Sequence, residues 1–199
     1  MCGLSSARFD AAIAAIDAAN ADDPTPVTVR GDAQPLALVH GVLAVEWVTR
    51  LSPRADEAVL LAARAHHLRR WELPRSQYEA GKAGYLRWKR DQRQRHARDV
   101  GVLLAEHGFA ADEIAVVQAL VQRQGLAAGD VGAQLVEDAA CLVFIETQLA
   151  DVATKLDHDH LVDVIRKTAK KMSPAALAAV AQIPLGTAER ALLAAALGG

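Results

Sequence analysis

The chain has 199 residues, of which 52% are hydrophobic and only 4% aromatic, a length that suits one domain with a sizeable core. No run of about 18 uninterrupted apolar residues occurs, so the sequence predicts no membrane span. The first twenty residues also lack the basic start and long apolar run of a signal peptide. Two cysteines, Cys2 and Cys141, are too few for a disulfide framework or a cysteine-rich zinc site. These features predict a cytoplasmic protein.

The net charge of −2 is the sum of two unlike parts. Between Arg64 and Arg98 there are eleven Lys or Arg residues and three acids, a net +8, whereas the rest of the chain carries −10. A basic segment inside an acidic protein favours an anionic ligand. The alternative interpretation is a solvated charged helix.

In chain order, the spacing of apolar residues first predicts a helix capped by Ser5 or Ser6, with Phe9, Ile13 and Ile16 on one face. Three prolines and two turn formers predict a loop over residues 21–35. A second helix is expected over 36–51. A third begins at Ser52-Pro53, carries the adjacent histidines and ends before Pro74.

The later helices are predicted over 84–107, 112–124, 134–156 and 157–171, with a last segment that begins at Ser173-Pro174. Gly108 and Gly125 end the first two of these, and the segment 134–156 is apolar nearly all round, as expected of a central buried helix. The chain is therefore predicted to be one compact all-α domain over 1–199. The C-terminal helices, 157–197, either complete that domain or form a small appended subdomain.

Five polar residues fall on faces that are predicted to be buried. His40 and His96 share the apolar stripes of their helices, and Asp138 lies among leucines and isoleucine on the central one. His66 and His67 project about 100° apart, so at least one of them faces the core. A buried carboxylate costs several kcal/mol unless it is paired, hydrogen-bonded or bound to a metal. Such a cluster of titratable groups predicts a functional site.

The order His40, then His66-His67, then Asp138 on a late buried helix resembles the HD superfamily of helical metal-dependent phosphohydrolases. That resemblance implies an HD-like helical bundle and a divalent metal held by His40, His66, His67 and Asp138. The sequence departs from the pattern at His67, which stands where the superfamily has an aspartate. The site thereby loses one negative charge, and no bound metal or other cofactor is expected in the preferred interpretation.

A resemblance over nearly the whole chain is carried by the segments RFDAAIAAIDAAN, LAARAHHLRRWELPRSQY, AGYLRWKRDQRQRHA, LVEDAACLVFIE and LVDVIRKTAKKMSP. They are similar to the family catalogued as domain of unknown function 4202, which has no established activity. The resemblance implies that the family's shared positions include His67, Arg69 or Arg70, Trp71, Pro74, Arg75, Tyr85, Trp88, His96 and Asp138. The shared chemistry is then a set of arginine, aromatic and histidine residues.

Such a set is suited to a small anionic substrate. Arginine grips phosphate, sulfate or carboxylate with two hydrogen bonds, and aromatic rings form flat apolar walls. Histidine moves protons near neutral pH, and a buried carboxylate orients a histidine or acts as a base. The predicted catalytic residues are His67, His96 and Asp138. The predicted substrate-binding residues are Arg69, Arg70, Trp71, Arg75, Tyr85 and Trp88.

Three hypotheses about function follow. The first is an acid–base enzyme without an essential metal, which acts on a small anion by hydrolysis or elimination. The second is a variant HD phosphohydrolase whose metal activates water. The third is a non-catalytic module that binds an anionic ligand or RNA, although the acidic remainder of the chain disfavours nucleic acid. Alternatively, Arg69, Arg70 and Arg75 pair with acids and only lock helices together.

Overall fold

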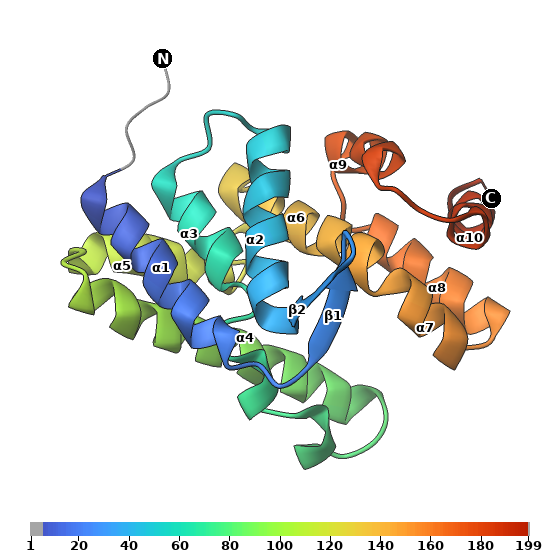
Figure 1. The fold of residues 1–199 in the computed structure, drawn as a ribbon, viewed down its shortest axis with the longest axis horizontal. Coiled ribbons are helices and arrows are strands. Elements are labelled where there is room, and N and C mark those ends of the chain that lie inside the picture. Colours follow the sequence, from blue (N-terminus) through green and yellow to red (C-terminus); the bar gives the residue numbers. More distant parts are fainter. Residues whose placement is uncertain (1–5, 199) are drawn as a thin grey trace.

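The structure is a computed structural model that describes residues 6–198, and within this range it consists of helices with one small hairpin (Figure 1). The predicted all-α fold class is confirmed. The main elements are α1 (Ala7–Ala21), β1 (Pro26–Val29), β2 (Asp32–Pro35), α2 (Leu36–Leu51), α3 (Glu57–Ala65), α4 (Lys82–Glu106), α5 (Ala111–Val121), α6 (Val131–Thr147), α7 (Leu149–Lys155), α8 (His158–Ala169), α9 (Pro174–Ala179) and α10 (Thr187–Leu197). None of the described helices is long and apolar enough to cross a membrane.

Two of the predicted helix starts are formed by serine caps. The Ser6 hydroxyl accepts a hydrogen bond from the Phe9 amide and begins α1, while Ser5 and Cys2 lie outside the described residues. The Ser173 hydroxyl accepts from the Ala176 amide, with Pro174 as the first residue of α9. Both contacts satisfy amides that have no partner inside the helix.

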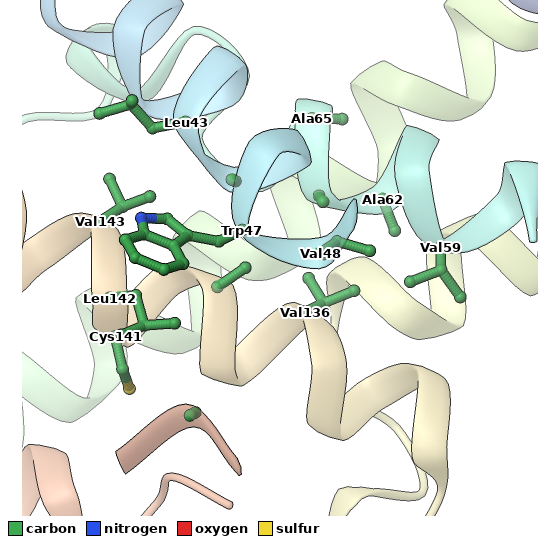
Figure 2. Packing of buried hydrophobic residues seen from close by; sticks show 14 of the residues in the cluster. Leu43, Trp47, Val48, Val59, Ala62, Ala65, Val136, Cys141, Leu142 and Val143 are labelled. Carbon is green, nitrogen blue, oxygen red and sulfur yellow. The ribbon is translucent and has the colours of Figure 1, made fainter. Parts of the chain in front are cut away.

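The core lies where α2 and α3 pack against α6 (Figure 2). Helix α6 also packs against α5, α7 and α9, as expected of the central helix. Trp47 on α2 is 2% exposed, and its indole Nε1 donates a hydrogen bond to Glu146 Oε2 at 2.8 Å. The longest helix, α4, runs along one side of this core and packs on α5 (Figure 1).

The prediction of a plain loop over 21–35 is wrong, because β1 and β2 form an antiparallel hairpin there. The turn consists of Arg30 and Gly31, with φ of 56° and 95°, as a two-residue hairpin turn requires. Pro26 pairs with Pro35 at the open end of the hairpin, where a missing amide proton does least harm. The prolines that predicted a loop therefore only delimit the strands.

The predicted third helix is both later and shorter than expected. It starts at Glu57 rather than at Pro53, and it ends at Ala65, before the histidines. The chain then turns through Arg69, whose φ of 49° is left-handed. The Arg69 amide donates to Asn20 Oδ1 at 2.9 Å and its carbonyl accepts from Arg95 Nη1 at 2.9 Å, which holds this conformation. His66 and His67 consequently lie on a turn.

The long helix predicted over 134–156 is also divided. Helix α6 ends at Thr147, and α7 begins at Leu149 after a break at Gln148. The residues that follow return along α8, which packs against α7 and α10. In this way α8 comes to face the same region as α4 and α6.

Candidate functional site

A cavity of about 250 Å³ lies between the turn after α3, one face of α4, and helices α6 and α8. The histidine-bearing turn and α4 provide most of its polar side chains, and α6 and α8 provide most of its apolar wall. This cavity is called the central pocket below. Its lining residues are His66, His67, Arg70, Tyr85, Trp88, Lys89, Gln92, Arg93, His96, Val121, Arg123, Glu137, Ala140, Cys141, Phe144, Val164, Thr168 and Lys171.

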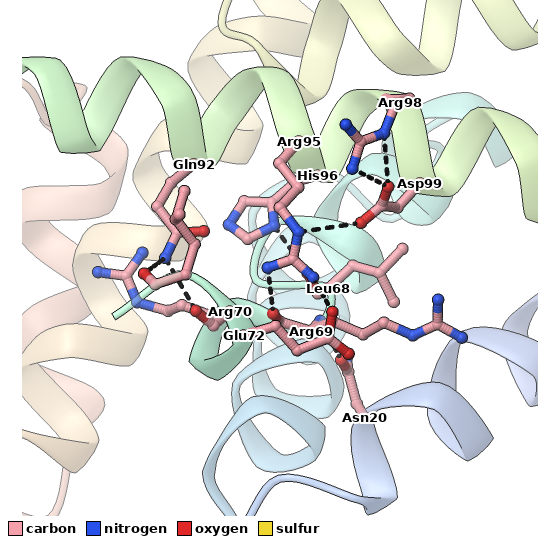
Figure 3. A network of polar contacts seen from close by, with 11 residues as sticks. Asn20, Leu68, Arg69, Arg70, Glu72, Gln92, Arg95, His96, Arg98 and Asp99 are labelled. Atoms are coloured by element: carbon pink, nitrogen blue, oxygen red, sulfur yellow. Dashed lines mark hydrogen bonds and ion pairs between the residues drawn. The ribbon is translucent and has the colours of Figure 1, made fainter. Parts of the chain in front are cut away.

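Helix α4 contributes one face to the central pocket. Tyr85, Trp88, Gln92 and His96 follow one another at steps of three or four residues, so they lie on one side of the helix. The Trp88 indole donates to the Leu73 carbonyl at 2.9 Å, and the Gln92 amide donates to the carbonyls of Arg70 and Leu73. These bonds hold the turn after α3 against α4 (Figure 3).

His66 and His96 are buried, and the same kind of contact fixes both rings. The Nδ1 of His66 donates to the Ala63 carbonyl at 2.8 Å, and the Nδ1 of His96 donates to the Leu68 carbonyl at 2.7 Å. Since a carbonyl only accepts, both rings carry their proton on Nδ1. Each Nε2 is therefore a lone-pair acceptor, and neither has a partner within residues 6–198.

His40 and His67 form a short hydrogen-bonded chain from Thr147 that ends at another imidazole nitrogen without a proton, the Nε2 of His67. The Thr147 hydroxyl donates to the Val143 carbonyl at 2.7 Å, so it accepts from His40 Nε2 at 3.1 Å. The Nδ1 of His40 is then an acceptor, and it receives the Nδ1 proton of His67 at 2.8 Å. The Nε2 of His67 is consequently a third lone-pair acceptor at the central pocket.

All four histidines are held neutral by their surroundings. Burial, and next the nearby Arg70 guanidinium, lower the pKa of His40 and of His96 to about 3. The pKa values of His66 and His67 are also lowered well below the usual value, first by burial and then by Arg123 and His66 respectively. At neutral pH these rings are therefore uncharged, and the Nε2 atoms of His66, His67 and His96 can accept a hydrogen bond but cannot donate one.

Three cations of the central pocket form no hydrogen bond or ion pair with any described side chain. The Arg70 guanidinium lies over the Trp88 ring, 4.6 Å from its centroid, and the Lys89 amine lies 5.5 Å from the Tyr85 centroid. Lys171 is the third. Burial lowers the pKa of Arg70, and burial together with Lys171 lowers that of Lys89. None of the three is thus held in a close ion pair, although Glu137 lies near enough to oppose the lowering of the Lys89 pKa and to have its own pKa lowered by Lys171.

The other charges of the pocket compensate one another. Arg123 donates to Glu137 Oε2 at 3.0 Å, and Arg93 lies 3.6 Å from the same oxygen. Arg123 also donates to the carbonyls of Leu120 and Val121, so its guanidinium is fully engaged. Burial acts to raise the pKa of Glu137, but Arg123 and Arg93 outweigh it and the pKa is lowered. Glu137 is therefore an ionised structural partner.

Asp138, one of the predicted catalytic residues, does not line the central pocket. Its carboxylate accepts from the Ser173 amide at 2.8 Å, the Ser173 hydroxyl at 2.6 Å and Gln134 Nε2 at 2.8 Å. These bonds fix the start of α9 against α6. The neighbouring Glu137 faces the pocket instead, because successive residues of a helix point about 100° apart.

Three of the six predicted substrate-binding residues also lie elsewhere. Arg69 leaves the turn in the direction opposite to Arg70 (Figure 3). Arg75 donates to the carbonyls of Tyr78, Glu79 and Gly81, and so ties the connection that leads into α4. Trp71 lines a second hollow of about 400 Å³ beside the hairpin, which shares Arg70 and Trp88 with the central pocket. Arg70, Tyr85 and Trp88 are the ones that the structure brings to the central pocket.

Sequence reasoning missed several residues of this pocket as site residues. Gln92 and Arg93 could have been found from their helical spacing to Trp88 and His96. Lys171 carried no comparable signal, because the return of α8 depends on the break at Gln148. Cys141 reaches the pocket wall as a thiol, since burial raises its pKa to about 12. It is therefore no ready nucleophile.

Three of the histidines lie close enough to share a metal ion. One ligand nitrogen from each of His40, His66 and His67 lies within 4.8 Å of the other two, within the described part of the chain. Neutral imidazoles whose second nitrogen is hydrogen-bonded to protein are good metal ligands. The short contact between His40 and His67 would have to open, because their facing nitrogens already share a proton.

Comparison with known proteins adds one finding. The model of the family described as Domain of unknown function (DUF4202) matches residues 10–193 of the chain. No curated protein and no solved structure matches it.

Proposed function

The chain belongs to the DUF4202 family, and we propose that it binds a small anionic substrate in the central pocket and acts on it by acid–base chemistry. The substrate class is a phosphate, sulfate or carboxylate. The reaction is hydrolysis, or elimination of an anionic leaving group.

The observation that carries this proposal is the set of unpaired cations Arg70, Lys89 and Lys171 around one cavity. Arg70 and Lys89 are partly buried whereas Lys171 is exposed, so a bound anion offsets a desolvation cost at Arg70 and Lys89. The Arg70 guanidinium can form two parallel hydrogen bonds to an oxyanion. Its position over Trp88 orients the group while leaving its edge for a ligand.

The histidines supply the proton chemistry of the proposal. His67 and His96 face the pocket as neutral rings with a free Nε2, so each is a base in the resting protein. Arg70 is one cause of their low pKa values, and an anion beside Arg70 would raise them. In hydrolysis, one Nε2 takes a proton from the attacking water and returns it to the leaving oxygen.

The test is calorimetric titration of phosphate, sulfate and acetate into the wild type, Arg70→Gln and Arg69→Gln. Both substitutions remove one charge from adjacent positions, but only Arg70 faces the pocket. We expect one anion per chain, binding roughly tenfold weaker in Arg70→Gln because a charge-assisted hydrogen bond is lost. Equal affinities in the two variants, or no binding of any anion, would contradict the proposal.

A second candidate is a metal-dependent hydrolase of the HD type, which the cluster of His40, His66 and His67 favours. Two observations disfavour this candidate. The Asp138 carboxylate accepts hydrogen bonds from Ser173 at the start of α9 and does not line the pocket, and the cations nearby repel a divalent ion. Our proposal expects less than one equivalent of transition metal in protein purified without a histidine tag. Stoichiometric zinc, manganese or iron that is lost in His66→Ala would promote the metal-dependent alternative.

A further inference from the structure

Within residues 6–198, four acceptor atoms of the central pocket lack a donor. They are the Nε2 atoms of His66, His67 and His96 and the Oε1 of Gln92, and three of them are fully buried. Buried polar atoms without a partner are rare in folded proteins, and each calls for an explanation. All four atoms belong to residues that line one cavity, so a molecule bound there is the nearest source of the missing donors.

The protein itself fixes these atoms as acceptors. Both amide protons of Gln92 are used, since its Nε2 donates to the Arg70 and Leu73 carbonyls, so the amide cannot be reversed without losing two bonds. The Nδ1 protons of His66 and His96 are bound by carbonyls, which excludes the other neutral tautomer. The polarity of this part of the pocket is therefore set before any ligand arrives.

The acceptors and the free cations occupy different stretches of the pocket. Lys89 and His96 are seven residues apart on α4, which corresponds to about 10 Å along the helix axis. Tyr85 lies with Lys89 at the start of the helix. Arg70 lies between, close to Trp88 and to the His96 ring. The free cation Lys89 thus lies toward the start of α4 and the histidine acceptors lie farther along it, where the nearby Arg123 is already bound to Glu137.

We infer that the ligand is a hydroxylated anion: an anionic group beside the free cations, and hydroxyl or amide N–H donors that reach His66, His96 and Gln92. This inference rests on the proposed function and specifies its substrate class as polyol or sugar phosphates and polyhydroxy acids. The donors are neutral, because an ammonium group would be repelled by Arg70, Lys89 and Lys171.

The test uses two matched pairs of probes that differ only in hydroxyl groups. Propyl phosphate is compared with glycerol 1-phosphate, and butyrate with 3,4-dihydroxybutyrate, by calorimetric titration. In the wild type the hydroxylated member of a pair binds roughly tenfold tighter, as expected for one or two additional hydrogen bonds to buried acceptors. The Arg70→Gln variant weakens both members equally and keeps the preference.

The variants His66→Asn and His96→Asn separate the acceptor from the fold. The Asn amide nitrogen takes the place of Nδ1 and keeps the bond to the Ala63 or Leu68 carbonyl, while the Nε2 acceptor is removed. His107→Asn is the matched control, because His107 makes the same kind of Nδ1 bond, to Leu103, outside the pocket. The preference for the hydroxylated probe should fall several-fold in the two pocket variants and stay unchanged in the control.

Two outcomes would overturn the inference. The first is binding that depends on Arg70 but is equal for both members of each pair, which would leave the proposed anion site intact. The second is the binding of one Zn²⁺ per chain by the dialysed protein that is lost in His66→Asn. That result would mean that the histidine lone pairs coordinate a metal ion. If every probe binds Arg70→Gln with the same affinity as the wild type, the proposed function itself is rejected.

Discussion

The neighbouring buried carboxylates of Asp138 and Glu137 have different hydrogen-bond partners. Its carboxylate accepts three hydrogen bonds from Ser173 and Gln134, whereas Glu137 is paired with Arg123 in the pocket wall. We predict that Asp138→Leu lowers the free energy of unfolding by about 3 kcal/mol, because it leaves three partly buried donor groups without their acceptor. Urea denaturation measures this loss. The affinity of the folded variant for phosphate should stay unchanged. Loss of phosphate binding without a loss of stability would instead show that Asp138 is part of the anion site.

The proton positions on the histidines are a second prediction at the residue scale. The hydrogen bonds assign Nδ1–H to His66, His67 and His96, and Nε2–H to His40. Long-range ¹H–¹⁵N spectra distinguish the two neutral tautomers. At pH 6 we expect four neutral rings with these assignments, because burial lowers each pKa. An Nε2–H tautomer at His67 would remove one of the pocket's acceptors and contradict the assignment.

The residues of the site could be predicted from sequence only where helical geometry fixed their direction. His96 and Trp88 lie on one face of α4, and the structure brings both to the pocket. Arg69 and Arg70 could not be told apart, since the left-handed turn at Arg69 decides which of them faces inward. The sequence also could not decide which of Asp138 and Glu137 faces the pocket, because both are buried and they differ by one helical step.

At the scale of elements, Gly84 controls how the connection from Arg75 enters α4. A Cβ at Gly84 would lie 2.0 Å from the Glu79 carbonyl oxygen, a backbone atom that cannot move alone. We predict that Gly84→Ala destabilises the protein by about 1–3 kcal/mol despite the higher helix propensity of alanine, since the clash outweighs that gain. Thermal unfolding measures the change. Ala83→Gly is the matched control and should cost about 1 kcal/mol through propensity alone.

If Gly84→Ala stabilises the protein instead, the backbone around Glu79 moves away from the new Cβ at little cost. Helix propensity would then dominate over the close contact with Glu79.

The elements themselves followed from apolar spacing and caps, and the departures have local causes. The hairpin of β1 and β2 was hidden by prolines at its ends, and only the positive φ of Arg30 and Gly31 reveals the turn. The early end of α3 depends on Asn20, a residue remote in sequence that holds the Arg69 amide. Neither the hairpin turn nor the contact between Asn20 and Arg69 is visible in the local pattern of apolar and polar residues.

For the whole molecule, the neutral histidines predict acid sensitivity. Their pKa values are lowered in the folded state, to about 3 for His40 and His96, whereas an unfolded histidine titrates near 6.5. The unfolded state therefore binds more protons as the pH falls below about 6.5, and stability is lost in that direction. Each such histidine contributes about 1.4 kcal/mol per pH unit between the two pKa values.

Counting only His40 and His96, whose pKa is about 3, we accordingly predict that the free energy of unfolding is at least about 2–3 kcal/mol lower at pH 5.5 than at pH 7.5, as measured by urea denaturation. The His96→Asn variant should show a shallower pH dependence, because one of the buried titrating groups is gone. A stability that is flat over this range would mean that the rings accept protons in the folded protein without cost.

The central claim concerns the whole pocket: unpaired cations and neutral histidines together make a site for an anion. The most direct measurement is a crystal structure of the untagged protein grown with sodium phosphate, with anomalous data collected at the zinc edge. We predict a phosphate hydrogen-bonded to the Arg70 guanidinium, in contact with Lys89 or Lys171 and close to the histidine Nε2 atoms, and no anomalous peak. A metal peak bonded to His40, His66 and His67, or an Arg70 turned away to a protein acceptor with no anion beside it, would contradict the account.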